Sequence, residues 1–189
     1  MRGSIFSRRR ASLLLVLLVA TAGLACGRNR VVLDVDARSF MDDADTIHPY
    51  AAPGLVPFTI RLDSIPVNLI EGFQDFGAAE SATIDLGILY DNLLGTGTGR
   101  FRLYFSDDPA TLFSTPPVAI LDANLAPATA TTAASHVLAD QRILDLLTGK
   151  QFWMGADMEW LSFTLEPLQG TASISQIDLH LVSTLELFQ

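Results

Sequence analysis

The chain has a single cysteine, Cys26, among its 189 residues. No intramolecular disulfide can form, so the folded part must be held together by packing and hydrogen bonds alone. Charged residues are also scarce at 17%, whereas apolar residues make up 49%. A chain of this composition can bury a sizeable core and is not of the disordered class. Since domains usually hold about 100–200 residues, we expect one domain.

Basic residues are rare beyond the first 25 positions. Four of the 12 lysines and arginines lie within those positions, together with no acidic residue, so the rest of the chain carries 8 basic against 21 acidic side chains, a formal charge of −13. An acidic surface without an arginine or lysine stripe repels phosphate backbones, so nucleic acid is not an expected partner. It also repels anionic lipid headgroups, so attachment to a membrane would require a covalent anchor.

Only one long apolar run stands out, over residues 11–20. Three arginines precede it at positions 8–10, and small residues follow it through Ala25. This order of charged, apolar and small residues is typical of a secretory signal. The run is shorter than the roughly 20 residues that a membrane-spanning helix needs. We therefore predict a cleaved signal peptide over residues 1–25.

The end of this segment, with the sequence AGLAC over residues 22–26, resembles a bacterial lipobox. The resemblance implies that Cys26 is acylated and becomes the new N-terminus of a bacterial lipoprotein. Gly23 departs from the leucine that is commonest at its position, and cleavage after Ala22 is the alternative. Gly27 is not the aspartate associated with retention in the inner membrane, so the resemblance implies a lipid anchor in the outer membrane of the cell envelope.

The rest of the chain is dominated by a period of two, with apolar residues alternating against polar ones between Gly, Pro, Asp and Asn. One-sided alternation with little helix between the segments favours antiparallel sheets. We predict a lipidated tether over residues 26–30 and then a mainly β domain over residues 31–189, an antiparallel β-sandwich of eight or nine strands, for which a jelly roll is one arrangement. The expected strands lie at 31–35, 58–62, 84–88, 101–105, 118–120, 161–165 and 177–187.

A single short helix is expected near residues 137–148. Apolar residues at Ala139, Ile143, Leu146 and Leu147 repeat with helical spacing, and Gly149 is placed to end the helix. The segment between residues 123 and 135 is rich in alanine and threonine and is expected to be either an edge strand or a loop.

The sequence offers no convincing catalytic motif, and no cofactor is expected. The glycine-rich run over residues 95–100 lacks the Lys-Ser/Thr end and the following helix of a phosphate-binding loop, so it is interpreted as a turn. His48, His136 and His180 are far apart and fit no paired zinc spacing. No serine lies in a nucleophile elbow. A carbohydrate-active hydrolase that uses two carboxylates is the remaining enzymatic alternative.

The acidic cluster at Asp42, Asp43 and Asp45 could bind calcium, because this ion prefers oxygen ligands. The spacing matches no calcium loop, because the glycine and the distal glutamate of such a loop are missing. A solvated acidic loop is the favoured interpretation, with calcium as the weaker hypothesis.

The segment over residues 151–166 predicts a hairpin with its turn at Met158 and Glu159. In that register both tryptophans point outward over small residues, as a platform for sugar rings or a partner protein. The alternative is that the tryptophans are covered by other parts of the fold. We therefore predict a non-catalytic envelope lipoprotein that binds a glycan or a partner protein, or that has a structural role in envelope assembly. The candidate surface comprises Trp153, Gly155, Asp157, Trp160, Ser162 and Glu166.

Overall fold

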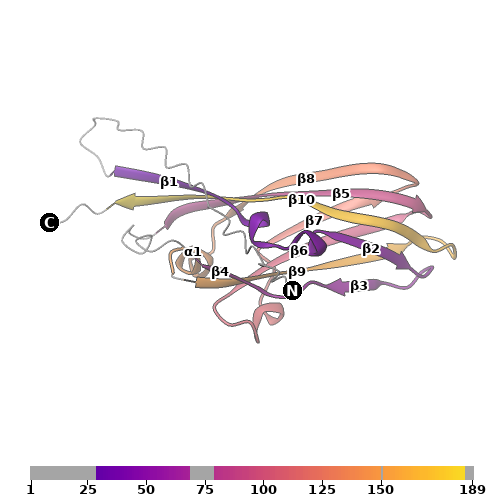
Figure 1. Ribbon diagram of the computed structural model, residues 1–189, viewed down its shortest axis with the longest axis horizontal. Coiled ribbons are helices and arrows are strands. Elements are labelled where there is room, and N and C mark those ends of the chain that lie inside the picture. Colours follow the sequence, from indigo (N-terminus) through magenta and orange to yellow (C-terminus); the bar gives the residue numbers. More distant parts are fainter. Residues whose placement is uncertain (1–28, 69–78, 150, 186–189) are drawn as a thin grey trace, which may run out of the picture.

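The computed structural model describes residues 29–68, 79–149 and 151–185. The predicted signal peptide and Cys26 therefore lie outside the described residues. The described chain confirms the prediction of a mainly β antiparallel sandwich, with two five-stranded sheets packed face to face (Figure 1). None of its helices is long and apolar enough to cross a membrane.

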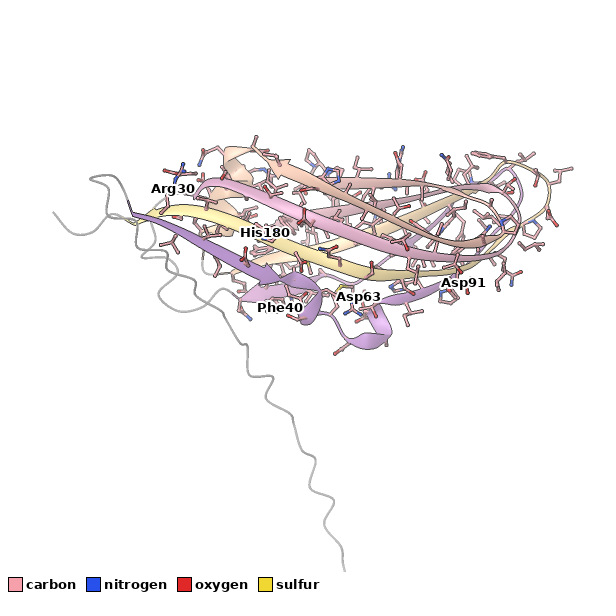
Figure 2. All side chains as sticks on the ribbon, turned by 90° about the horizontal axis from the view of Figure 1, so that it is seen from above. Arg30, Phe40, Asp63, Asp91 and His180 are labelled. Carbon is pink, nitrogen blue, oxygen red and sulfur yellow. The ribbon has the colours of Figure 1, made fainter. Side chains whose placement is uncertain are left out.

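The first sheet is built around the C-terminal strand. Its order is β1 (Asn29–Asp36), β10 (Leu168–Leu185), β5 (Ala79–Leu94) and β8 (Ala128–Leu138), and β2 (Ile47–Ala52) pairs with another part of β10. Every pairing is antiparallel. Figure 2 shows this sheet with His180 on β10 and Asp91 on β5.

The second sheet has the order β3 (Phe58–Arg61), β9 (Gln151–Ser162), β6 (Gly97–Ser106) and β7 (Ala119–Leu125). The short strand β4 (Ile65–Asn68) pairs with the first residues of β9, and β3 pairs with residues near its end. Because β9 lies between these short strands and β6, both of its backbone edges are hydrogen-bonded over much of its length.

The core lies between the two sheets and follows the alternation of each strand. Phe101, Leu103 and Phe105 of β6 are buried, as are Ile84 and Leu86 of β5. These are the apolar members of the predicted strands, because burying one face of each sheet is the main favourable term in folding.

In β10 the residues that point into the core are even-numbered in its first half and odd-numbered in its second half. Ala172 and Ile174 point into the core from its first half, and Ile177 and Leu179 do so from its second half. The register with β5 shifts between Ile174 and Gln176, so Ser175 is an extra residue of the kind found in a β-bulge. The predicted alternation from residue 177 is therefore correct. The strand begins earlier, at Leu168, and before the bulge it is the even-numbered residues that are buried.

Among the described residues, the helical segments are α1 (Gln141–Leu147) and the short 3₁₀ turns η1 (Ala37–Phe40), η2 (Asp43–Asp45) and η4 (Leu112–Ser114). The helix α1 lies inside the predicted range 137–148. The Asp140 side chain caps it by accepting a hydrogen bond from the Arg142 N–H at 2.9 Å. Its buried face consists of Ile143, Leu144 and Leu147.

Two strand predictions were wrong in detail. The expected strand at 118–120 lies at Ala119–Leu125, and Leu121 rather than Ile120 is buried. The expected strand at 161–165 does not exist as such, because β9 ends at Ser162 and the chain turns there. Phe163 and Leu165 are exposed in that turn. The segment between residues 123 and 135 does contain an edge strand, β8.

Candidate functional site

The orientation of the two tryptophans decides where a surface site can lie. β9 continues without a break through Met158 and Glu159, so the predicted hairpin turn is wrong. Along one strand, even-numbered residues stay on one face, which places Trp160 in the core. Trp160 is fully buried, and its ring stacks on Tyr50 at 4.8 Å and lies 6.1 Å from Phe58. Trp160 is therefore a core residue, as the alternative interpretation held.

The other members of the predicted surface are divided between the outer face and the turn after β9. Trp153, Gly155 and Asp157 do share the outer face of β9, and Trp153 is half-buried. Ser162 is buried, and its hydroxyl donates to the backbone oxygens of Thr164 and Glu166, which stabilises the turn. Glu166 is exposed in that turn and does not flank the outer face.

The predicted flat floor at Gly155 is covered. The turn η4 folds over the outer face, and a Cβ atom at Gly155 would lie 2.6 Å from Leu112 Cδ2 and 2.9 Å from Phe113 Cζ. A larger residue at this position would force the side chains of Leu112 and Phe113 to move. The turn η4 therefore brings Phe113 onto the face, between Trp153 and Asp157.

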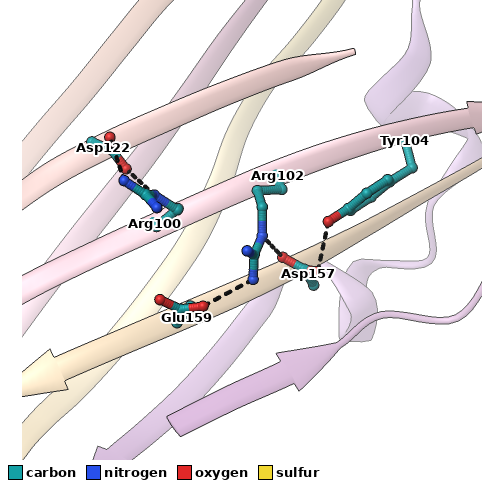
Figure 3. Close-up of polar contacts among 6 residues, drawn as sticks. All are labelled: Arg100, Arg102, Tyr104, Asp122, Asp157 and Glu159. Carbon is teal, nitrogen blue, oxygen red and sulfur yellow. Dashed lines mark hydrogen bonds and ion pairs between the residues drawn. The ribbon is translucent and has the colours of Figure 1, made fainter. Parts of the chain in front are cut away.

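Arg102 of β6 lies at the centre of a row of charges on this outer face (Figure 3). Its Nε donates to Asp157 Oδ1 at 2.6 Å, and its Nη2 donates to Glu159 Oε2 at 3.0 Å. The register explains the contact, since Arg102 is directly opposite Asp157 in the antiparallel pair of β6 and β9. The Asp157 side chain is only 6% exposed, and the Arg102 guanidinium provides the opposite charge beside it.

The row continues onto β7 through a more exposed pair. Arg100 is opposite both Glu159 and Asp122 in the register, and its Nε donates to Asp122 Oδ1 at 2.7 Å. Hydrogen bonding to Arg100 holds the pKa of the Asp122 carboxyl below its usual value. The side chains are 47% and 59% exposed, so this pair is largely screened by water.

Aromatic rings adjoin the charges at Asp157. The Tyr104 hydroxyl donates to Asp157 Oδ2 at 2.9 Å, and the Tyr104 ring meets Phe113 edge-on at 5.3 Å. Burial of the Tyr104 hydroxyl raises its pKa, and the hydrogen bond to Asp157 raises it further. On the other side, the Arg61 guanidinium carbon lies 4.4 Å from the centre of the Phe113 ring. We call Arg61, Arg102, Tyr104, Phe113, Asp157 and Glu159 the outer-face cluster.

The outer-face cluster keeps hydrogen-bonding capacity for a ligand. The ion pairs use Nε and Nη2 of Arg102, which leaves its Nη1 without a partner among the described residues. Glu159 Oε1 is likewise unpaired there, and this side chain is 32% exposed. Arg61 is exposed, and its guanidinium group lies over the face of the Phe113 ring. One neutral surface thus offers donors, an acceptor and an aromatic ring.

The other residues that the sequence singled out form no site in the described structure. No group of three or more histidines, cysteines, aspartates or glutamates that could hold a metal ion exists among the described residues. The calcium hypothesis at Asp42, Asp43 and Asp45 thus gains no support, and the Asp43 side chain is outside the described set. His48 lies in the strand β2 rather than in the loop expected from its position before Pro49, and its Nε2–H donates to the Asp45 backbone oxygen at 2.7 Å. Gly95 has a φ of +79°, which agrees with a turn.

The outer-face cluster was missed in part because the wrong pairing was assumed for β9. Arg100 and Arg102 alternate on β6 just as Asp157 and Glu159 alternate on β9, with charges of opposite sign. That complementarity is a readable signal for pairing β6 with β9. Phe113 was not predictable in the same way, because it reaches the face from the connection between β6 and β7, whose path is not set by strand periodicity.

No protein-family model and no curated protein matches the chain. Among solved structures it is similar to a family 28 carbohydrate-binding module specific for non-crystalline cellulose, at 9% identity and a TM-score of 0.42 over 69% of this chain and 71% of that one. It is also similar to a protein of infectious bursal disease virus strain Gx, at 13% identity and a TM-score of 0.41, over 93% of this chain and 43% of that one.

A third similar structure is a family 61 carbohydrate-binding module in complex with β-1,4-galactotriose. The identity is 11% and the TM-score 0.34, over 78% of this chain and 80% of that one. With identities this low and TM-scores this small, these likenesses say nothing of what the present chain binds.

Proposed function

We propose that this protein is a non-catalytic binding protein of the cell envelope, and that the outer-face cluster binds a glycan. The observation that carries the proposal is the position of Arg102, which is held by Asp157 and Glu159 on the outer sheet face beside Phe113 and Arg61. Sugar hydroxyls both donate and accept hydrogen bonds, and sugar rings also have apolar C–H faces. A ligand of this kind needs fixed donors, a carboxylate and an aromatic ring, which the cluster provides.

The rigidity of the site favours binding over catalysis. Its polar groups lie on two paired strands and restrain one another, so little ordering is required when a ligand arrives. Asp157 and Glu159 are both engaged by one arginine on an outward face. This arrangement does not resemble the two carboxylates of a glycoside hydrolase, which flank a sugar bound between them.

A glycan array with neutral, acidic and amino sugars tests the proposal. We expect binding by the native chain and a loss of about tenfold or more on Arg61→Ala, because an exposed contact of about 1.4 kcal/mol corresponds to tenfold in affinity. The matched control is Arg142→Ala, which removes another exposed arginine, at the start of α1, that is not part of the outer-face cluster. Absence of binding across the array, or equal losses for the two variants, would contradict the proposal.

We also propose that Cys26 is lipidated and anchors the domain to the bacterial envelope, at the outer membrane. The lipobox-like sequence supports this, and so does the absence of a basic patch that could replace the anchor. β1 begins at Asn29, three positions after Cys26. Three residues span at most about 10 Å, so the folded domain would be held close to the bilayer.

A further inference from the structure

The strand β8 has one free backbone edge in the first sheet (Figure 1). One side of β8 pairs with β5 without a register shift, from Ala82 opposite Leu138 to Asn92 opposite Ala128. No backbone hydrogen bond reaches its other side from any described residue. Unpaired N–H and C=O groups along 11 residues are a template for another strand.

Other edges of the two sheets carry features that discourage such pairing. β2 and β4 contain Pro49 and Pro66, and β3 and β4 have only four residues each. β1 carries Asp34 among its charged residues, and β7 carries Asp122. Short edges, prolines and charges are the usual protections against edge-to-edge association.

β8 has none of these protections. Its sequence, ATATTAASHVL, contains no charged residue and no proline, and no charged residue occurs between Asp122 and Asp140. The side chains on its outer face are small up to Val137, which is 73% exposed. In a protein as acidic as this one, an uncharged free edge of this length is the exception that requires an explanation.

We propose that β8 pairs antiparallel with β8 of a second copy, so that the first sheets of two protomers form one continuous sheet. An axis through the middle residue, Ala133, would place Thr131 opposite Ser135 and Thr129 opposite Val137. No like charges then face each other, and the facing side chains are small enough to pack. A closed two-fold dimer uses the same edge on both copies and leaves no free β8 edge for further growth.

The acidic residues of the neighbouring strand β5 do not oppose the pairing. Asp85 and Asp91 belong to β5, one strand away from the edge. Their counterparts in the second copy would be three strand spacings distant, roughly 14 Å at about 4.8 Å per spacing. This exceeds the screening length of about 8 Å at physiological salt, so their repulsion is weak.

The first test is the mass of the detergent-solubilised full chain, measured by sedimentation against protein concentration. We expect a dimer, and Ala133→Lys should weaken it by about tenfold or more, because two lysines would then face each other at the axis. Ser81→Lys is the matched control, since it adds the same charge at an exposed position of β5 and should leave the dimer intact. A chain that is monomeric at all concentrations, or a dimer that both variants leave unchanged, would overturn the proposal.

A cysteine scan keeps the test independent of any folding defect in Ala133→Lys. Under mild oxidation Ala133→Cys should cross-link to itself, because directly opposed residues of an antiparallel pair have Cα atoms about 4.5–5.5 Å apart, within disulfide range. Thr129→Cys should cross-link only when it is mixed with Val137→Cys. Ser81→Cys, measured in the same way, should form no cross-link. Cross-linking of Ser81→Cys at the rate of Ala133→Cys would show random collision and would refute the predicted pairing.

Discussion

Trp153 and Trp160 lie on the same strand but on opposite faces of the sheet. Their positions differ by an odd number, so any unbroken strand separates them, and only a turn between them could bring both outward. The prediction of such a turn rested on Met158 and Glu159, yet Met158 is buried and paired with Phe101. Packing of Trp160 against Tyr50 thus outweighed a turn for which the local sequence gave little support.

Arg102 should be far more important for stability than Arg100. Arg102→Gln removes the ion pair of Asp157, a nearly buried carboxylate, and should lower the free energy of unfolding by about 1–3 kcal/mol. Arg100→Gln breaks an exposed pair with Asp122 and should cost less than about 1 kcal/mol. Urea unfolding of the two variants measures the difference. Equal losses would mean that Asp157 does not depend on Arg102.

The strands β1, β10 and β5 are linked on their outer side by His180 (Figure 2). Its Nδ1 lies 2.6 Å from Asp34 Oδ1, and its Nε2 lies 3.1 Å from Asp85 Oδ2. Only the imidazolium form donates from both nitrogens. Hydrogen bonding to Asp34, opposed by partial burial and reinforced by Asp85, raises the pKa of His180 above 6.5. His180 lies on the solvent side of its strand, because its neighbours Leu179 and Leu181 point into the core.

This link should make the first sheet less stable as the pH rises above 6.5. Because the folded-state pKa of His180 is raised, its contribution to stability is complete below pH 6.5 and is lost as the pH rises through the folded-state pKa. The melting temperature of the native chain should therefore fall over that window more than that of His180→Gln. Asp34→Asn should also reduce the fall. Parallel pH profiles for the native chain and His180→Gln would exclude this role.

The length of each strand, and which of its residues are buried, depended on the strands that it pairs with in the fold. The period of two identified β1, β3, β5 and β6, whose apolar residues are buried in β5 and β6 and partly buried in β1 and β3. It did not reveal the bulge at Ser175, because a bulge is an extra residue relative to a partner strand, and the partner is known only in the fold. The short strands β2 and β4 each contain a proline, which does not favour a strand in the sequence.

At the scale of the whole molecule, the acidic surface and the lipobox-like sequence make one prediction together. Intact-mass analysis of the membrane fraction should show a diacyl- or triacylglyceryl adduct on a chain that begins at Cys26. Concentrated salt should not release this chain, because the mature part, with its net charge of −13, has no electrostatic attraction to anionic lipids.

The contrast variant for the anchor is Cys26→Ser, which should lose the acyl mass and shift the folded domain toward the soluble fraction. The acyl chains supply the attachment in this proposal, since buried CH₂ groups contribute about 0.8 kcal/mol each. A native chain that begins at Gly23 and is recovered in the soluble fraction would show that an ordinary signal peptidase cleaves after Ala22.

The sequence by itself determined the sandwich class, the single short helix and the acidic character of the domain. These follow from local periodicity and composition, which act over a few residues and do not depend on which strand pairs with which. Only the tertiary structure decided that Trp160 enters the core, that Arg102 meets Asp157 and Glu159, and that η4 places Phe113 beside them. These contacts join strands up to 57 residues apart, and a shift of one residue in register would turn each strand's side chains to the opposite face.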